Sequence, residues 1–409
     1  MSETDWKPTT ATELASLVLE NFENERRPLI PCGGRTSLHF GYPVAGEPIL
    51  VSTTALESVI DYPCRDMTIT VEAGMRVEKL QEILREEGQR LPIDVPEGHR
   101  ASIGGAIASN ASGPSQFGYG TFRDYVIGIS AIDGQGRLFS AGGRVVKNVA
   151  GYDFCKLLTG SEGMLGAITQ VTLKVRPVVE CRELVWVTVS DKSLIEPILD
   201  RLNLSATNPV VQDLLNSLGA AYVRNEAKLD LPAETQVLCL GFEGSQQEVE
   251  WQVRIVQEEL AGIGEVSSQP LIGEAADQIW HALTDYQTAS DDPVSFRSRI
   301  LPSQVAEFFE KADEAEIAVL CHAGNGVVHG HLSDHVTDPH VARTILEPLR
   351  AIATRQSGSL TVTHCDPQWS SDMDLFGPQG SDWQLMANIK RALDPANIFC
   401  PGKLWRERN

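Results

Sequence analysis

The stretch from residue 91 to residue 175 contains two segments that are almost free of bulky side chains. In Ser102–Gly113, ten of the twelve residues are Gly, Ala, Ser or Asn, and Gly160–Gly166 holds three glycines. Such backbone can be approached closely by another backbone or by a flat ligand, and a backbone N–H that no ladder uses can point at an anion. Apolar runs with strand character follow each segment, at Tyr125–Ile132 and Ala167–Val175. The stretch therefore predicts a ligand cradle that is made of loops and held by strands.

Length and charge exclude several classes of partner. A chain of 409 residues is long enough for two or three domains, and its net charge of −21 argues against nucleic acid, which needs a basic footprint. The same charge argues against simple electrostatic binding to an anionic membrane, and a small carboxylate substrate would need Arg or Lys close by. The first residues show no signal-peptide pattern, and no apolar run is long enough to span a bilayer. We therefore expect a cytoplasmic protein, which a partner could hold at the inner face of the membrane.

The eight cysteines include no C-x-x-C pair. An iron–sulfur cluster or a structural zinc site held by this chain alone is therefore not expected. Reduced and mostly buried thiols fit a chain of the cytoplasm.

A second candidate for anion binding lies near the N-terminus. Thr10–Asn24 has apolar residues at helical spacing with Thr12 as the expected cap, and a short strand at Pro28–Pro31 then runs into a turn. Successive backbone N–H groups in a glycine-containing turn form a concave anion site, and hydroxyl groups add donors. Arg35 either clamps a phosphate in a bidentate manner or points into water. The candidate binding residues of this turn are Cys32, Gly33, Gly34, Arg35, Thr36 and Ser37.

Strand and helix patterns continue along the chain. Ile49–Val51 and Thr68–Val71 have strand character, and Val77–Gly88 has the pattern of an amphipathic helix. After Pro177 the composition changes, and two β-α-β passes predict a ferredoxin-like substrate domain. Its expected strands are Cys181–Ser190, Val237–Phe242, Pro293–Ile300 and Ile317–Leu320, its expected helices are Leu194–Leu204, Gln246–Leu260 and Pro302–Ala312, and Ala261–Ser290 is the expected connector.

Several motifs occur together in a fixed order. They are "IGGAIASNASG", "GYGTFRDYVIG", a "DG" hairpin signal at Asp133, "KNVAGYD" and "GSEGMLGAITQVTLKV". Together they resemble the FAD-binding domain of the vanillyl-alcohol oxidase / p-cresol methylhydroxylase (PCMH-type) family, and within it most closely the FAD-binding E subunits of bacterial glycolate oxidases. The tail "MANIKRALDPANIFCPGKL" resembles the ending of the family, with Lys403 facing either the cofactor or solvent.

The resemblance implies an α+β fold with a two-lobed PCMH-type FAD-binding domain and a ferredoxin-like α+β cap or substrate domain. The FAD-binding domain is expected at residues 1–177, with a small lobe at about 1–90 and a large lobe at about 91–177. The cap domain would occupy residues 178–385, and residues 386–409 would pack back on the FAD-binding domain.

The resemblance also implies FAD, with its pyrophosphate in the turn at residues 32–37. Covalent attachment in the family often uses a His directly after two glycines, where this chain has Arg35, so we expect non-covalent FAD. His39 is then expected to be a capping or surface histidine, and Lys147 and Asn148 lie either near the flavin ring or in an ordinary turn. The other family positions around the cofactor correspond to Ser102, Ile103, Gly104, Gly105, Ser109, Asn110, Gly113, Glu162, Gly163, Gly166 and Ile168.

The motif "CHAGNGVVHGHL" at residues 321–332 is the candidate catalytic segment. On a strand, His329 and His331 would share a face, and His322 precedes His329 by seven residues. The motif resembles the "HAGDGNLH" stretch of FAD-linked 2-hydroxy-acid dehydrogenases, whose histidines near the flavin bind a metal or position the substrate hydroxyl and take its proton. Asn325 replaces the usual Asp, and "THCDPQW" lies where the family has its acidic "GEHGIG" patch. Metal binding, substrate contact without metal and a purely structural strand pair stay open, and no metal ligand is assigned.

The predicted function is FAD-dependent oxidation of a small 2-hydroxy acid, most directly glycolate to glyoxylate. Because the chain has no cluster motif, its electrons would leave through another polypeptide or a quinone. The resemblance implies a complex with a second flavin subunit and an iron–sulfur subunit. Two alternatives are a non-catalytic FAD-holding subunit that relays electrons and a stand-alone alcohol oxidase that uses oxygen.

Overall fold

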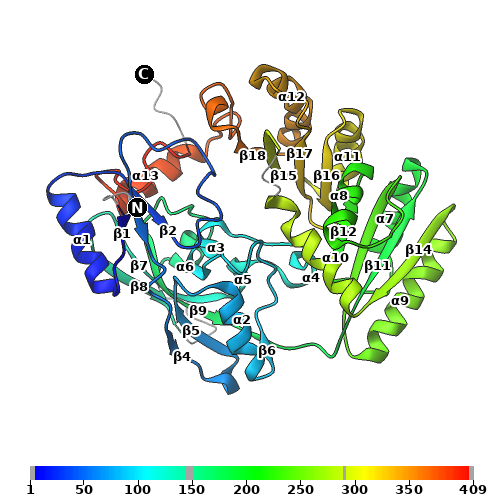
Figure 1. Cartoon of the computed structure of the whole chain (residues 1–409), viewed down its shortest axis with the longest axis horizontal. Coiled ribbons are helices and arrows are strands. Elements are labelled where there is room, and N and C mark those ends of the chain that lie inside the picture. Colours follow the sequence, from blue (N-terminus) through cyan, green and yellow to red (C-terminus); the bar gives the residue numbers. More distant parts are fainter. Residues whose placement is uncertain (1–4, 144–150, 289–291, 405–409) are drawn as a thin grey trace. The chain divides into compact units, whose positions relative to one another are not determined.

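The computed structural model describes residues 5–143, 151–288 and 292–404 (Figure 1). These residues form two compact units, and the chain passes between them more than once. The first unit contains residues 1–112, 120–178 and 378–409, and the second contains residues 113–119 and 179–377. None of the helices in the described ranges combines the length and the apolar character that crossing a membrane requires.

The first unit is built on two main sheets. Its three-stranded parallel sheet has the order β1-β3-β2, and its five-stranded antiparallel sheet has the order β4-β5-β9-β7-β8. Strands β6 and β10 form a separate antiparallel pair. The elements are β1 (Asp5–Trp6), α1 (Ala11–Glu23), β2 (Leu29–Cys32), β3 (Ile49–Ser52), β4 (Val59–Asp61), β5 (Thr68–Glu72), α2 (Val77–Glu86), β6 (Gln89–Arg90), α3 (Ile103–Ser109), α5 (Phe122–Tyr125), β7 (Val126–Ile132), β8 (Leu138–Gly142), α6 (Phe154–Leu158), β9 (Ala167–Lys174), β10 (Arg176–Pro177) and α13 (Trp383–Leu393).

Each sheet of this unit has its own apolar core. One core lies between the five-stranded sheet and helices α2 and α3, and Leu80 and Leu84 are fully buried there on the inner face of α2. The other core joins α1 to the three-stranded sheet and includes Leu14, Val51 and Phe399. Helix α1 begins after Thr10, whose hydroxyl accepts a hydrogen bond from the Glu13 N–H, so the expected cap at Thr12 is wrong by two residues.

The first unit has two parts, one for each main sheet, and the strand pairing puts the boundary between these parts before residue 90. Strands β4 and β5 pair into the five-stranded sheet, where β5 lies next to β9. The three-stranded sheet therefore ends with β3, and α2 belongs to the part that holds β7 and β9. The expected domain boundaries at residues 177 and 385 stay predictions.

The second unit holds one antiparallel sheet of eight strands in the order β14-β11-β13-β12-β16-β17-β15-β18. Strands β11 to β14 occupy half of this sheet in the order fourth, first, third, second, and β15 to β18 occupy the other half in the mirrored order. Strands β15 to β18 and their helices follow the order β-α-β-β-α-β, and β11 to β14 follow the same order with one further helix, α8, between β12 and β13, so the ferredoxin-like prediction is confirmed. The elements are α4 (Gln116–Tyr119), β11 (Cys181–Val189), α7 (Ile195–Asn203), β12 (Val211–Leu215), α8 (Ser217–Ala227), β13 (Gln236–Gly244), α9 (Gln246–Ala261), β14 (Val266–Ile272), α10 (Glu274–Asp285), β15 (Val294–Arg299), α11 (Val305–Glu314), β16 (Ala318–His322), β17 (Val327–Leu332), α12 (Pro339–Arg355) and β18 (Ser359–Cys365).

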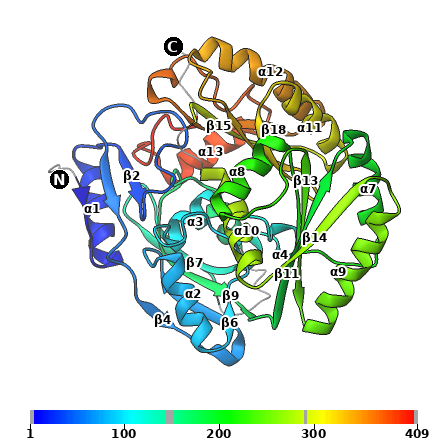
Figure 2. The same cartoon turned by 45° about the vertical axis from the view of Figure 1, so that its right-hand side comes forward.

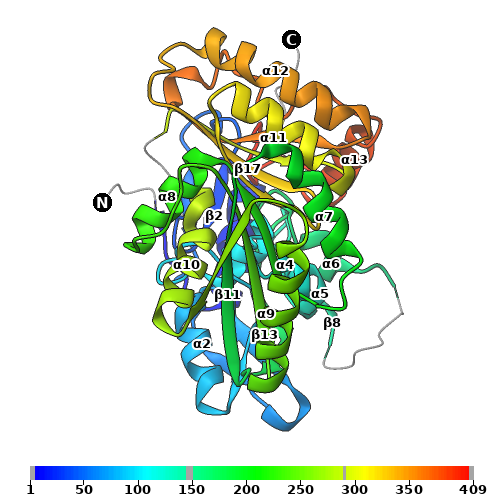
Figure 3. The ribbon, with the colours of Figure 1, turned by 90° about the vertical axis from the view of Figure 1, so that its right-hand side faces the viewer.

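Helices cover the long sheet of this unit. Helix α9 packs along β11 and β13 (Figure 3), while α11 packs on β16 and α12 packs on β18. Helices α8 and α10 lie side by side, as Figure 2 also shows. The expected connector Ala261–Ser290 contains β14 and α10, so its reading as a mere connector is wrong.

Candidate functional site

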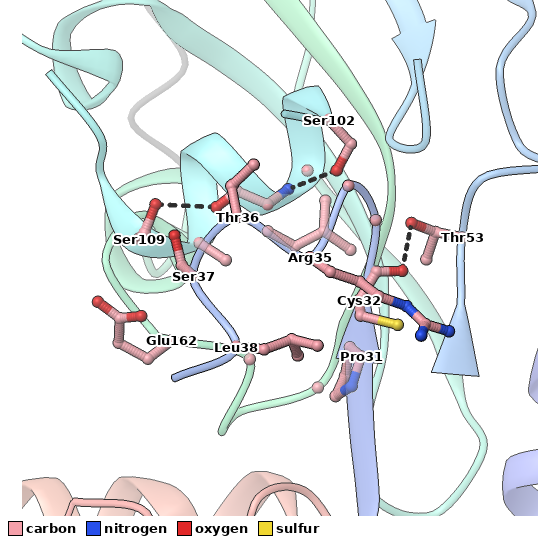
Figure 4. A pocket seen from close by; sticks show the side chains of 18 of the residues that line it. Pro31, Cys32, Arg35, Thr36, Ser37, Leu38, Thr53, Ser102, Ser109 and Glu162 are labelled. Atoms are coloured by element: carbon pink, nitrogen blue, oxygen red, sulfur yellow. Dashed lines mark hydrogen bonds between the residues drawn. The ribbon is translucent and has the colours of Figure 1, made fainter. Parts of the chain in front are cut away.

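A pocket in the first unit gathers most of the sequence-predicted cofactor residues (Figure 4). It encloses about 700 Å³, counting the space that is open to solvent. Its walls are the turn after β2, helix α3 and the glycine loop before β9. The predicted residues that line it are Cys32, Gly33, Gly34, Arg35, Thr36, Ser37, Ser102, Gly104, Gly105, Ser109, Glu162, Gly163, Gly166 and Ile168.

The turn after β2 offers backbone donors. Within the described residues, the N–H groups of Gly33 to Ser37 donate no hydrogen bond to the protein. The turn packs directly on the start of α3, because a Cβ on Gly33 would lie 1.9 Å from Ser102 Oγ and a Cβ on Gly34 would lie 1.8 Å from the Arg100 carbonyl oxygen. Only glycine permits this approach, and the resulting row of unused N–H groups is a concave site for an anion.

Within the segment Ser102–Gly113, Ile103–Ser109 forms helix α3 where the sequence predicted a loop. Ser102 is the N-cap of α3, and its Oγ accepts a hydrogen bond from the Gly105 N–H at 3.3 Å. The Ile103 N–H donates to the Met75 carbonyl, and the Gly104 N–H donates to the Ala73 carbonyl. The first turn of α3 is therefore already satisfied by the protein, so an anion in the pocket would depend on the turn at residues 33–37.

Arg35 forms an ion pair that the sequence did not indicate. Its backbone is left-handed, with φ of 61°, and its guanidinium donates to an Asp5 carboxylate oxygen at 3.0 Å. This hydrogen bond raises the pKa of Arg35 above its usual value. In Figure 4 the guanidinium lies on the Cys32 side of the pocket, away from Thr36 and Ser37. The backbone of Arg35 therefore adopts the left-handed conformation that glycine accommodates most easily.

The loop between α6 and β9 forms another wall. Glu162 and Gly163 have φ of 51° and 70°, and Gly166 has φ of 144°. A Cβ on Gly166 would lie 2.3 Å from the Ile132 carbonyl oxygen, so this glycine is required by the approach of the loop to β7. Five further lining residues are absent from the predicted set: Pro31, Leu38, Thr53, Ala108 and Lys403. For Lys403 the sequence allowed either the cofactor side or solvent, and the structure buries its side chain in the pocket wall.

Three predicted cofactor residues lie outside the lining of this pocket. Ile103 is fully buried in the core beneath α3, and Asn110 ends that helix in the left-handed conformation. Gly113 belongs to the second unit. Lys147 and Asn148 lie outside the described residues.

The three candidate catalytic histidines come together in the second unit. His322 ends β16, and His329 and His331 are two residues apart on β17, with side chains on one face as predicted. The rings of His322 and His329 are 5.5 Å apart. All three side chains are buried.

Each histidine has a different environment. His322 Nδ1 lies 2.6 Å from an Asp213 carboxylate oxygen on β12. His331 Nδ1 lies 3.0 Å from Ser295 Oγ, and its ring packs edge-on against Tyr286 at 4.8 Å. Burial lowers the pKa of His331 to about 4 and holds the pKa of His329 well below its usual value. His329 and His331 are therefore neutral at pH 7 but weak proton acceptors.

Sequence reasoning missed Asp213, because nothing local marks a single Asp in a strand that is 109 residues away from its partner. His364 lies opposite Ser295 on β18, close to His331, so the "THCDPQW" segment contributes to this cluster after all. In the part of the chain that the structure describes, no group of three or more His, Cys, Asp and Glu side chains is arranged to hold a metal ion.

Two families match successive parts of the chain. Residues 6–142 match the family described as "FAD binding domain", and residues 204–404 match "FAD linked oxidases, C-terminal domain". The glycine-lined pocket with its unused N–H groups fits the pyrophosphate of FAD, since close backbone approach and free backbone donors are what such a group requires.

Some relatives that are named for an enzymatic activity match only part of the chain, and others match nearly all of it. D-2-hydroxyglutarate dehydrogenase of Xanthomonas citri pv. viticola is 39% identical over 146 residues, which are 36% of this chain and 31% of that protein. Glycolate oxidase subunit GlcE of Escherichia coli K12 is 34% identical over 155 residues, 38% of this chain and 44% of that protein. D-lactate dehydrogenase of Archaeoglobus fulgidus is 26% identical over 418 residues, 98% of this chain and 91% of that protein.

Solved structures share the fold. The structure of 4-ethylphenol oxidase from Gulosibacter chungangensis matches with a TM-score of 0.70 at 14% identity, over 98% of this chain and 89% of that chain. At this identity the match supports the α+β, PCMH-type fold and carries no statement about substrate.

Proposed function

Since this chain belongs to the FAD-linked oxidases with a PCMH-type FAD-binding domain, we propose that it oxidises a small 2-hydroxy acid, with glycolate as the first candidate. It is an FAD-linked oxidoreductase, and its relatives include enzymes named for glycolate, D-lactate and D-2-hydroxyglutarate. The observation that carries the proposal is the glycine-lined pocket, which offers free backbone N–H groups within the region that matches the FAD binding domain.

The chain's own residues would bind and orient the cofactor. The N–H groups of residues 33–37 would hold the pyrophosphate, and Lys403 adds a positive charge at the same pocket. When bound, FAD supplies the two-electron acceptor of the oxidation. We propose non-covalent binding, because the residue after Gly34 is Arg35, whose side chain pairs with Asp5.

Among the histidines, His322 is the best candidate to take the hydroxyl proton of the substrate. Asp213 only accepts hydrogen bonds when it is ionised, so His322 must donate through Nδ1, which leaves Nε2 as a proton acceptor. The negative charge of Asp213 would also stabilise the imidazolium that forms. His329 and His331 have a lowered pKa, so they suit hydrogen bonding to the substrate better than proton uptake.

The electrons would pass to a partner. We propose a complex that contains a second flavin subunit and an iron–sulfur subunit, by analogy with the relative that is named as a glycolate oxidase subunit. A cytoplasmic location, with contact to the membrane through such a partner, stays part of this proposal.

Dye-linked turnover of the FAD-loaded chain tests the substrate. We expect kcat/KM for glycolate to exceed the value for D-lactate by about tenfold, the discrimination that one extra carbon typically permits, and to exceed the value for the larger D-2-hydroxyglutarate by at least as much. Acid precipitation of the same sample should release all flavin into the supernatant. A higher turnover with D-lactate than with glycolate would make D-lactate the preferred substrate. Flavin that stays with the precipitated protein would contradict non-covalent binding.

A second candidate function is a non-catalytic FAD-holding subunit that relays electrons for a partner. It is favoured by Asn325, which replaces the usual acidic residue of the histidine motif. This function predicts no dye reduction by the isolated chain with any of the three acids, although FAD is bound. Hydrogen peroxide production in air would instead favour an oxidase.

A further inference from the structure

A buried ammonium group in the first unit has three protein acceptors. Lys390 on α13 is 4% exposed, and its Nζ donates to the Met164 carbonyl at 2.8 Å, to the Phe399 carbonyl at 2.7 Å and to an Asp394 carboxylate oxygen at 2.5 Å. A lysine has three N–H donors, so all of them are used. A buried charge persists only where its partners compensate for lost hydration, and this geometry meets that condition.

The first acceptor belongs to one wall of the cofactor pocket. Met164 lies in the glycine loop, between Gly163 and Gly166, which both line the pocket. Met164 lies outside any helix or strand, and the left-handed residues Glu162 and Gly163 precede it. The bond from Lys390 therefore fixes the carbonyl at the centre of this loop.

The other two acceptors connect Lys390 to the pocket wall that is formed by the turn after β2. Asp394 accepts hydrogen bonds from the Ile398 and Phe399 N–H groups. The segment 398–400 pairs with β2, because Leu29 donates to the Ile398 carbonyl and accepts from the Cys400 N–H. Strand β2 continues directly into the turn at residues 33–37 that offers the free N–H groups.

We propose that Lys390 and Asp394 are a positioning pair that holds the two walls of the FAD pocket at the spacing FAD requires. Neither residue lines the pocket, so they act through the glycine loop and through segment 398–400. The proposal rests on the proposed function only in placing FAD in this pocket, and it is independent of the substrate.

FAD affinity separates positioning from simple stabilisation. In Lys390→Met we expect the dissociation constant for FAD, measured by flavin fluorescence at 15 °C, to rise by about tenfold or more, a change that corresponds to 1.4 kcal/mol. The control is Leu84→Ala, which opens a cavity under α2 in the same unit at a residue that does not line the pocket. It should lower the melting temperature while leaving the FAD dissociation constant within about twofold.

A lone buried carboxylate could prevent Lys390→Met from folding, so the double variant K390M/D394N removes both charges and provides a second test. Circular dichroism verifies folding before each titration. Weakened FAD binding in the folded double variant, with a normal constant in Leu84→Ala, supports the proposal. Unchanged FAD affinity in folded K390M or K390M/D394N overturns it. Absence of FAD binding by the wild-type chain would overturn the proposed function and this proposal together, whereas wild-type binding with unchanged variants overturns this proposal alone.

Discussion

Asp213 and His322 lie on neighbouring strands, and their hydrogen bond fixes which imidazole nitrogen can accept a proton. Both side chains are buried, so the carboxylate has no competing water layer and its effect on the ring is strong. His331 Nδ1 lies farther from a carboxylate, at 3.5 Å from Asp292, and burial lowers the pKa of both His329 and His331. At the residue scale, proton uptake therefore depends on one pair.

Asp213→Asn tests this pair. An asparagine amide can donate to Nδ1, which would place the imidazole proton on Nε2 and remove the acceptor, so we expect kcat to fall by about 100-fold, in the range of general-base effects. His322→Gln should lower kcat at least as much, and the double variant should be no worse than H322Q. FAD affinity should not change in these variants. Wild-type kcat in Asp213→Asn would exclude this role for Asp213.

His331 makes folding stability depend on pH. Its folded pKa of about 4 lies below the ordinary value of 6.5, so between these values the unfolded state binds a proton that the folded state does not. The free energy of unfolding should therefore fall as the pH drops from 7 toward 4. Ser295, Tyr286, Asp292 and His364 surround the ring.

Urea unfolding of wild type and His331→Asn at pH 7.5 and pH 5 measures this contribution. Since one pKa unit is worth about 1.4 kcal/mol, the loss of stability on going to pH 5 should be about 2 kcal/mol smaller in the variant. Equal losses in the two proteins would mean that His331 is protonated in the folded state at pH 5.

At the scale of elements, the pocket depends on the contact between the turn after β2 and the start of α3. Gly33 lies against the side chain of Ser102, which also caps the helix. The two segments are far apart in sequence, and they fit only because one of them lacks a side chain. The residues of this turn line the pocket, and within the described residues their N–H groups donate no hydrogen bond to the protein.

Gly33→Ala should disrupt this contact, since its Cβ would lie 1.9 Å from Ser102 Oγ and 2.5 Å from Ser102 Cβ. We expect FAD affinity to fall by about 100-fold, consistent with a misplacement of the turn by about 1 Å. G33A/S102G removes both clashing atoms and should recover part of the affinity, because a glycine in place of the Ser102 cap costs α3 only a few tenths of a kcal/mol. Equal FAD affinity in the single and double variants would show that the clash is not the cause.

At the scale of the whole molecule, local patterns predicted many of the elements and much of the pocket lining. Strands β7 and β9 and helices α2 and α9 lie within a few residues of their expected ranges, because their apolar periodicity reflects burial on one face. The turn at residues 33–37 and the glycine loop could be found because close approach requires glycine, and glycine is visible in the sequence.

Long-range pairing could not be predicted in the same way. The pairing of β5 with β9, the bond from Asp213 to His322 and the ion pair of Arg35 with Asp5 join residues whose local sequence does not specify a partner. The burial of Lys390 could not be predicted either, since a lysine on an amphipathic helix is usually solvated. The loop prediction for the small-residue run 102–113 is wrong for Ile103–Ser109, because short side chains are compatible with either conformation.

The measurement that tests the central claim most directly is the visible spectrum of the FAD-loaded chain during anaerobic titration with glycolate. If this chain oxidises glycolate, we expect the oxidised-flavin band to bleach with about one equivalent of glycolate per flavin, since one 2-hydroxy acid delivers two electrons. A flavin band that none of glycolate, D-lactate and D-2-hydroxyglutarate reduces would contradict catalysis by this chain.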